Sequence, residues 1–426
     1  MSVNKSGVKT GSNRWSRIIV FVQAMLDQGA QSLVNLVVGV VAARALSASD
    51  FGAFSIAFLL FTVAWGSYRA LLVEPAIVLF REAPVTQVLD AKAGMIVLSL
   101  MLTAPLCAVG WISGSMQQEP IASALKAFST ILPCIIFLDV IRGIFHAARQ
   151  PISAAIVSAT WLCIVLVLYI AIDVTDSEGI YLLVLPFGII AGLLAIYSIR
   201  SSYQNILAHI RQMQVKVVLK IGWPLFLDFL LVGITIHLMG LLLGFFYGLE
   251  QAGAFRGATI IVGPLVTLIA GARLASLSDA TRYRAASGDN QWKAYLIRVT
   301  SIGMPICVFL GLLLLWFSDN YGTKILGETW AAAQSVVLPM TLFIIATFVH
   351  LVTGAVLRAR ELAVLSLMTR FKQLPIVIGC SWIGMYNGEA SGAAWGLFVG
   401  NLLSIPFWVH AALSNQVTST QNSNTI

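Results

Sequence analysis

Carboxyl groups lie inside long apolar stretches of this 426-residue chain. Burying a carboxyl group in an apolar environment costs free energy, so such residues are candidates for a functional role. Asp27 and Asp228 each lie about ten residues inside such a stretch. Burial favours the protonated form of a carboxyl group, so one of the two is expected to bind a coupling ion, either H⁺ or Na⁺. The alternatives are a structural hydrogen bond inside the helical bundle and the capping of an irregular helix.

Asp139 and Arg142 are three residues apart and therefore share one face of a helix, where they can form an ion pair. Such a pair lowers the cost of placing both groups in an apolar environment. A second interpretation gives Arg142 a ligand, because a guanidinium group can bind phosphate oxygens in a bidentate fashion.

Three more arginines are candidates for a cavity or an interface. Arg69 could extend to lipid head groups or line the entrance to a cavity, and it lies five residues before Glu74, a poor spacing for an α-helical pair. Arg44 and Arg256 lie near the ends of apolar stretches, where they could hold an anionic ligand or anchor the helix at the interface.

His237 and His350 are the two histidines deepest inside apolar stretches. Histidine changes charge near neutral pH, so either residue could bind a coupling proton, although a single structural hydrogen bond would also explain each of them.

Enzyme motifs are absent from the sequence. It contains no GxxxxGK[ST], HExxH or GxSxG pattern, and its five cysteines form no CxxC or Cys/His cluster. We therefore expect no catalytic residues, no metal and no cofactor.

The composition is that of a polytopic membrane protein, with 58% hydrophobic and only 10% charged residues. About 20 apolar residues cross a bilayer, and breaks in apolarity predict about twelve transmembrane helices. The predicted spans are 18–45, 51–73, 89–112, 121–146, 152–173, 179–199, 218–245, 252–274, 294–317, 331–357, 363–385 and 390–413.

The basic residues predict the orientation. With both termini in the cytoplasm, 21 of the 26 Lys and Arg residues fall in inner segments, in agreement with the positive-inside rule. Arg69 lies within the second span, and the four outer basic residues are Arg44, Lys126, Arg256 and Lys324. The net charge of +8 thus indicates contact with membrane lipids and needs no nucleic-acid partner.

The sequence contains an internal repeat. Gly52-Ala53-Phe54 recurs as Gly253-Ala254-Phe255, and the same shift of 201 residues aligns Asp27 with Asp228. A shift of 211 aligns "RGIFHAAR" (142–149) with "TGAVLRAR" (353–360). Each match pairs spans six apart, which predicts two six-helix bundles of the same orientation and a cavity between them.

The predicted domains follow from this repeat. They are a cytoplasmic tail (1–17), an N-lobe with the first six spans (18–199), a cytoplasmic linker (200–217), a C-lobe with the last six spans (218–413) and a disordered tail (414–426).

The stretches "VGVVAARALSASDFGAFSIAFLLFTV" (38–63), "GLEQAGAFRGATIIVGPL" (248–265) and "YGTKILGETWAAAQSVVLPM" (321–340) resemble bacterial polysaccharide flippases. This family belongs to the superfamily that also contains multidrug exporters of the MATE type (the MOP superfamily).

The resemblance implies two lobes around a central cavity and alternating access. It also implies transport of an undecaprenyl-pyrophosphate-linked oligosaccharide to the outer leaflet of the bacterial cytoplasmic membrane, for O-antigen, capsule or exopolysaccharide synthesis. A proton or sodium gradient would drive the transport, and a glycan polymerase and other assembly proteins would be partners. The alternatives are an antiporter of small molecules or drugs and, more remotely, a glycan-processing membrane enzyme, although the predicted outer loops are too short for a catalytic domain.

Overall fold

The chain is almost entirely helical in the part that the computed structural model describes, which comprises residues 14–80, 85–148, 150–172, 215–287, 291–360 and 362–414 and scattered positions between 180 and 193. The helices of the N-terminal half are α1 (Arg14–Ala45), α2 (Ala48–Tyr68), the π-helical turn η1 (Arg69–Val73), α3 (Glu74–Leu79), α4 (Val85–Ser115), α5 (Ile121–Ala147) and α6 (Pro151–Ala171). Those of the C-terminal half are α9 (Val215–Tyr247), α10 (Leu249–Ser287), α11 (Trp292–Leu326), the 3-10 turn η3 (Gly327–Thr329), α12 (Trp330–Ala359) and α13 (Ala363–Leu413).

The described helices are long and apolar enough to span a membrane repeatedly. Eight stretches qualify, and two of them, Trp292–Ala359 with 68 residues and Val364–Leu413 with 50, exceed the length of a single crossing. The predicted all-α polytopic fold is therefore confirmed. The sixth predicted span, the linker 200–217 and the tails 1–17 and 414–426 lie mostly outside the described residues.

α13 contains the last two predicted spans. The backbone leaves helical geometry at Gly388 and Glu389, which separates the spans 363–385 and 390–413. Gly392 and Gly396 then approach the preceding helix so closely that a Cβ atom on either one would overlap backbone atoms of Gly384 or Cys380. Small residues thus allow the two parts of α13 to pack against each other.

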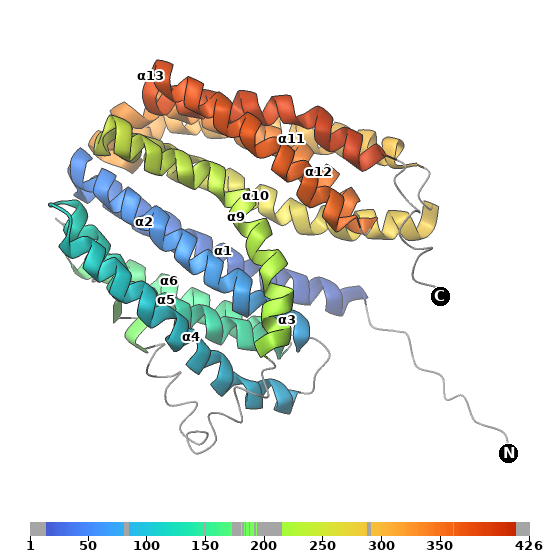
Figure 1. Ribbon diagram of the computed structural model, residues 1–426, viewed down its shortest axis with the longest axis horizontal. Helices are drawn as coiled ribbons and strands as arrows, with labels where there is room; N and C mark the ends of the chain where they lie inside the picture. The colour runs from blue at the N-terminus through green and yellow to red at the C-terminus, as the bar shows by residue number, and fades with distance from the viewer. Residues whose placement is uncertain are drawn as a thin grey trace.

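Figure 1 shows α1 to α6 as one group and α10 to α13 as another, with α9 crossing between them. α9 bends by 52° between Val215–Leu231 and Thr235–Tyr247. The bend lies at Gly233 rather than at Pro224, and Gly222, in the first part of α9, contacts the backbone of Leu71 in the N-terminal half. The described start of α1 and the end of α13 lie on the same side of the molecule (Figure 1).

The two halves meet through contacts that obey the internal repeat. A Cβ atom on Gly39 of α1 would lie 2.9 Å from Ile260 Cδ1 of α10, and one on Gly240 of α9 would lie 2.5 Å from Leu59 Cδ1 of α2. A shift of 201 residues converts the first contact into the second. Such an exchange of partners is the property of two halves related by a twofold axis.

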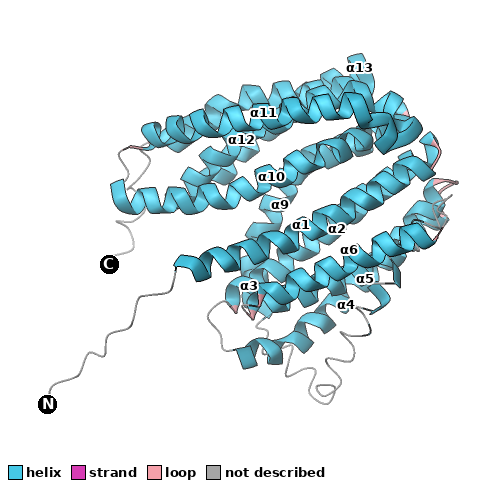
Figure 2. Cartoon of the chain, turned by 180° about the vertical axis from the view of Figure 1, so that it is seen from behind, coloured by secondary structure: helices cyan, strands magenta, loops and turns pink. Residues whose placement is uncertain are grey.

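The repeated Gly-Ala-Phe segments lie at this axis. A Cβ atom on Gly52 would overlap the carbonyl group of Leu249, and one on Gly253 would lie 3.5 Å from the carbonyl oxygen of Ala48. The same shift again exchanges the two contacts. The segments are therefore the place where the first turns of α2 and α10 cross at close range. Figure 2 shows α1 and α2 beside α10 from the opposite side.

Candidate functional site

A buried charge cluster lies in the N-terminal half around Asp27. Both oxygens of Asp27, a residue with no exposed surface, accept hydrogen bonds. Arg142 donates from Nε to Oδ1 (2.8 Å) and from Nη2 to Oδ2 (2.7 Å). Ser158 Oγ donates to Oδ1 (2.6 Å), and Nε2 of His146 lies 2.8 Å from Oδ2. Asp27 thus joins α1 to α5 through a bidentate ion pair with Arg142 and to α6 through the hydrogen bond from Ser158.

The cluster extends along α5 to the end of α2. Arg142 Nη1 donates to Oδ1 of Asp139 (3.0 Å), which confirms that these two residues share a helix face. Arg69 Nη1 lies 3.6 Å from the same Asp139 oxygen, and the other oxygen, Oδ2, is buried without a hydrogen-bond partner. The structure therefore brings Asp27, Asp139, Arg142 and Arg69 together.

The prediction that Arg69 and Glu74 are poorly spaced to interact is wrong. Arg69 Nε lies 3.4 Å from Glu74 Oε1. The cause is the π-helical turn η1, in which the N–H group of Glu74 bonds to the carbonyl group of Arg69, five residues earlier. A π-helical turn winds more slowly than an α-helix and so places positions five apart on one face.

A more exposed counterpart of the cluster occurs in the C-terminal half. Asp228 of α9 lies 3.6 Å from Arg358 Nη2 of α12 and 3.9 Å from Arg370 Nε of α13. The acidic residues occupy repeat-equivalent positions, and α12 is the repeat partner of α5. The Asp228 side chain is 36% exposed, whereas the Asp27 side chain is inaccessible. Of these two ion-pair clusters, the one around Asp27 and Arg142 is thus sealed from solvent.

An open cleft lies between the two halves, beside their close contacts. Its walls are formed by α1, including Gly29, Ser32 and Asn35, and by α10, with contributions from α9 and α12. No acidic side chain is among the described residues that line it.

Arg256 is the cationic residue in the wall of this cleft. Its guanidinium carbon lies 4.1 Å from the centre of the Phe58 ring, and Nη1 is 3.4 Å from Thr259 Oγ1. Its Nε is buried without a hydrogen-bond partner, and the described chain offers it no carboxylate within ion-pair distance. Within the described residues, the Phe58 ring and the Thr259 hydroxyl group are therefore the contacts of this cation.

The remaining predicted candidates lie apart from the charge cluster. Arg44 is exposed in the last turn of α1, close to Gly327. His237 lies on α9 near Gly233 and has a buried, unpartnered Nδ1. His350 is buried between α12 and α13, where its Nε2 lies 2.8 Å from Ser404 Oγ and its ring contacts Trp408 edge to face.

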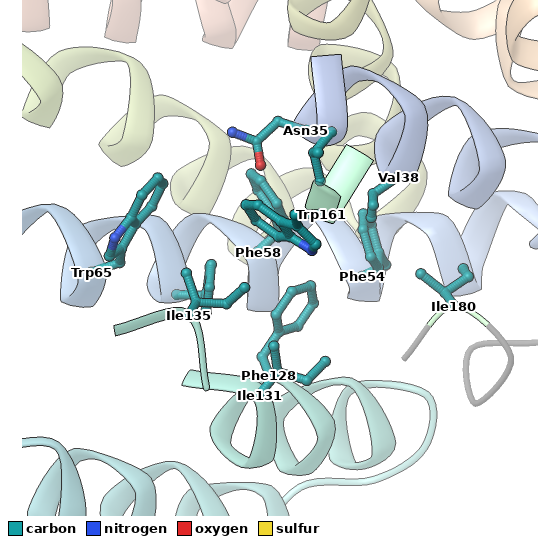
Figure 3. A pocket seen from close by; sticks show the side chains of 12 residues that line it. Asn35, Val38, Phe54, Phe58, Trp65, Phe128, Ile131, Ile135, Trp161 and Ile180 are labelled. Atoms are coloured by element: carbon teal, nitrogen blue, oxygen red, sulfur yellow. The ribbon is translucent and has the colours of Figure 1, made fainter. Parts of the chain in front are cut away.

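A narrow pocket lined by aromatic side chains lies within the N-terminal half (Figure 3). Phe54, Phe58, Phe128 and Trp161 are among its lining residues, and Asn35 lines both this pocket and the central cleft. The Phe58 ring that contacts Arg256 therefore also forms part of the pocket.

Three contributors to the site were missed at the level of sequence. His146 and Ser158 bind Asp27, and Phe58 contacts Arg256. His146 follows Arg142 by four residues, a spacing that could have placed it on the same helix face. Ser158 and Phe58 carried no comparable signal, since their roles depend on which helices pack together.

No family model and no curated relative matches the chain in sequence. Among solved structures, similar folds include an inward-facing MATE multidrug transporter of the MOP superfamily (16% identity, TM-score 0.69, 93% of this chain and 100% of the other). A eukaryotic MATE transporter has 15% identity, a TM-score of 0.67 and coverage of 94% and 96%. A MOP superfamily transporter from Pyrococcus furiosus has 16% identity, a TM-score of 0.64 and coverage of 92% and 94%.

These matches extend over nearly the whole of each chain, so they compare complete helical arrangements. At 14–16% identity the likeness is one of architecture. The chain has the fold of the MATE transporters of the MOP superfamily.

Proposed function

We propose that this chain is an alternating-access transporter that moves an undecaprenyl-pyrophosphate-linked oligosaccharide from the inner to the outer leaflet of the bacterial cytoplasmic membrane. The observation that supports the proposal is Arg256, a cation without a carboxylate partner in the described chain, in the wall of the cleft between the halves. The transported glycan would enter polysaccharide synthesis, with a glycan polymerase as a downstream partner.

The charge of the cleft favours an anionic substrate. A guanidinium group that has given up water without gaining a carboxylate retains unused hydrogen-bond donors, and phosphate oxygens match them in geometry. An organic cation would meet Arg256 as a like charge and find no acidic side chain among the described lining residues. The Asp27 and Asp139 carboxylates are engaged by Arg142, so they offer such a cation little attraction.

Transporters with this fold do not all have the same kind of pocket. Several of the similar structures are multidrug transporters, whereas the Pyrococcus furiosus structure is described as having a binding pocket of reverse polarity that suggests a different function. A cationic cleft is therefore compatible with the architecture. A MATE-like antiporter of organic cations is the alternative that the test must distinguish from a flippase.

A proton or sodium gradient is proposed as the energy source, with Asp228 as the coupling residue. A coupling ion at Asp27 would have to displace the bidentate Arg142. The Asp228 side chain is 36% exposed, so an ion can reach it from solvent, whereas Asp27 has no exposed surface. His237 and His350 are secondary candidates for the same role.

Deletion of the gene, followed by analysis of membrane lipids, tests the proposal. One undecaprenyl-linked oligosaccharide should accumulate, and the wild-type gene should remove it. Arg256→Gln should fail to do so, because the neutral amide loses the charge-assisted bonds to pyrophosphate. Arg44→Gln makes the same chemical change at an exposed arginine outside the cleft and should restore transport.

Two results would contradict the proposal. One is an unchanged lipid profile together with greater sensitivity of the deletion strain to organic cations, which would indicate the antiporter. The other is full restoration of transport by Arg256→Gln, which would show that transport does not need the positive charge of Arg256.

A further inference from the structure

A second groove, outside the central cleft, runs along the surface between α10 and α11. Its walls are apolar, with Leu265 and Leu268 on α10 and Ile302 and Ile306 on α11, and Phe348 of α12 forms its floor. Leu268, Ile302 and Ile306 are each more than half exposed. Gly303 allows this depth, because a Cβ atom there would overlap the Phe348 ring.

One end of the groove is charged. Asp279 of α10 and Arg298 of α11 line it and lie 3.7 Å apart, with side chains 55% and 57% exposed. Arg298 also contacts the rings of Tyr283 and Tyr295 at 5.6 and 5.7 Å. Together with Trp292 these rings form an aromatic cluster of the kind that lies at the level of lipid head groups.

The dimensions of the groove correspond to one leaflet. The helical segment from Leu265 to Asp279 rises by 14 residue steps, which span roughly 20 Å, and half of a hydrocarbon core measures about 15 Å. The charged end adjoins the connection between α10 and α11, which the distribution of basic residues places on the cytoplasmic side. The groove thus has a charged end at the inner surface and an apolar part that reaches toward the middle of the membrane.

We propose that this groove is a specific binding site for a zwitterionic phospholipid of the inner leaflet with an ethanolamine head group. Arg298 binds the phosphate, Asp279 binds the ammonium group, and one acyl chain lies along Leu268, Ile302 and Ile306. The pair has one charge of each sign, and this complements a head group with one phosphate and one amine. A pyrophosphate, with several negative charges, would be repelled by Asp279, which separates this site from the proposed substrate cleft.

Native mass spectrometry of the purified full-length protein, in the presence of equal amounts of phosphatidylethanolamine and phosphatidylglycerol, tests the proposal. Wild-type protein should bind phosphatidylethanolamine preferentially. Asp279→Asn removes the partner of the amine and keeps Arg298, so the preference should fall roughly fivefold, the effect of one charge near a membrane surface. Arg298→Gln should weaken the binding of both lipids.

Lys324→Gln is the matched control, because it removes a charge from the other end of α11, outside the groove, and should leave the preference unchanged. The proposal is overturned if wild-type protein shows no preference or if Asp279→Asn keeps it. Retention of a polyprenyl lipid in place of the phospholipid would also overturn it. None of these measurements requires transport, so their outcome is independent of the proposed substrate.

Discussion

The Arg142 side chain has two carboxylate partners, Asp27 and Asp139, in a part of the N-terminal half that solvent does not reach. Removal of one member of a buried ion pair leaves an uncompensated charge, which typically costs about 3–5 kcal/mol. Arg142→Gln should therefore lower the thermal unfolding temperature of the purified protein markedly, and Arg142→Lys should recover only part of the loss because an ammonium group cannot bond both Asp27 oxygens in bidentate fashion.

Arg298→Gln is the control for Arg142→Gln, because it removes one member of an exposed ion pair. Its partner Asp279 is 55% exposed at 3.7 Å, and exposed pairs contribute about 0–1 kcal/mol. Equal losses of stability in Arg142→Gln and Arg298→Gln would show that the buried cluster does not hold α1 and α5 together.

At the scale of helices, the crossing of α2 and α10 depends on the absence of a side chain at Gly52. A Cβ atom there would overlap backbone atoms of Leu249, which cannot move aside as a flexible side chain would. Overpacking of this kind typically costs about 1–3 kcal/mol. Gly52→Ala should therefore lower the unfolding temperature, as followed by the thermal loss of the monodisperse species in detergent.

Gly379→Ala is the control for this change. It lies within α13 and has open space where the Cβ atom would be, so the substitution should be neutral or stabilising by up to about 1 kcal/mol through helix propensity. If both alanine variants melt at the same temperature, close contact between α2 and α10 is not needed for the stability of the molecule.

In the molecule as a whole, the reciprocal contacts of the two repeats and the cleft between them both follow from the pairing of two similar halves. The same 201-residue shift that exchanges Gly39 with Gly240 also relates Asp27 to Asp228, yet the two acidic residues differ in their surroundings. One is sealed by Arg142, and the other is partly open. The halves thus share an architecture, but their equivalent acidic residues have different electrostatic environments.

The apolar pattern predicted the helical spans because about 20 apolar residues suffice to specify a crossing regardless of its neighbours. The Asp139–Arg142 pair was equally predictable, since it depends on a single helix. The Asp27–Arg142 pair spans 115 positions and depends on how α1 and α5 pack, which no local pattern records. The Arg69–Glu74 pair was not predicted because residues five apart do not share a face of an α-helix. In the π-helical turn η1 the backbone hydrogen bond joins residues five apart, and the two side chains then lie on the same face.

Direct binding of undecaprenyl pyrophosphate to the purified protein tests the proposal that the cleft binds a pyrophosphate-linked lipid through Arg256. Wild-type protein should bind this lipid, and Arg256→Gln should bind it at least about tenfold more weakly, because a hydrogen bond to a charged group contributes about 1.5–3 kcal/mol. Arg44→Gln should bind it as the wild type does. Equal affinity of the wild type and Arg256→Gln would show that Arg256 does not bind the pyrophosphate group, and preferential binding of the lipophilic cation tetraphenylphosphonium in the same assay would show that the cleft takes cations.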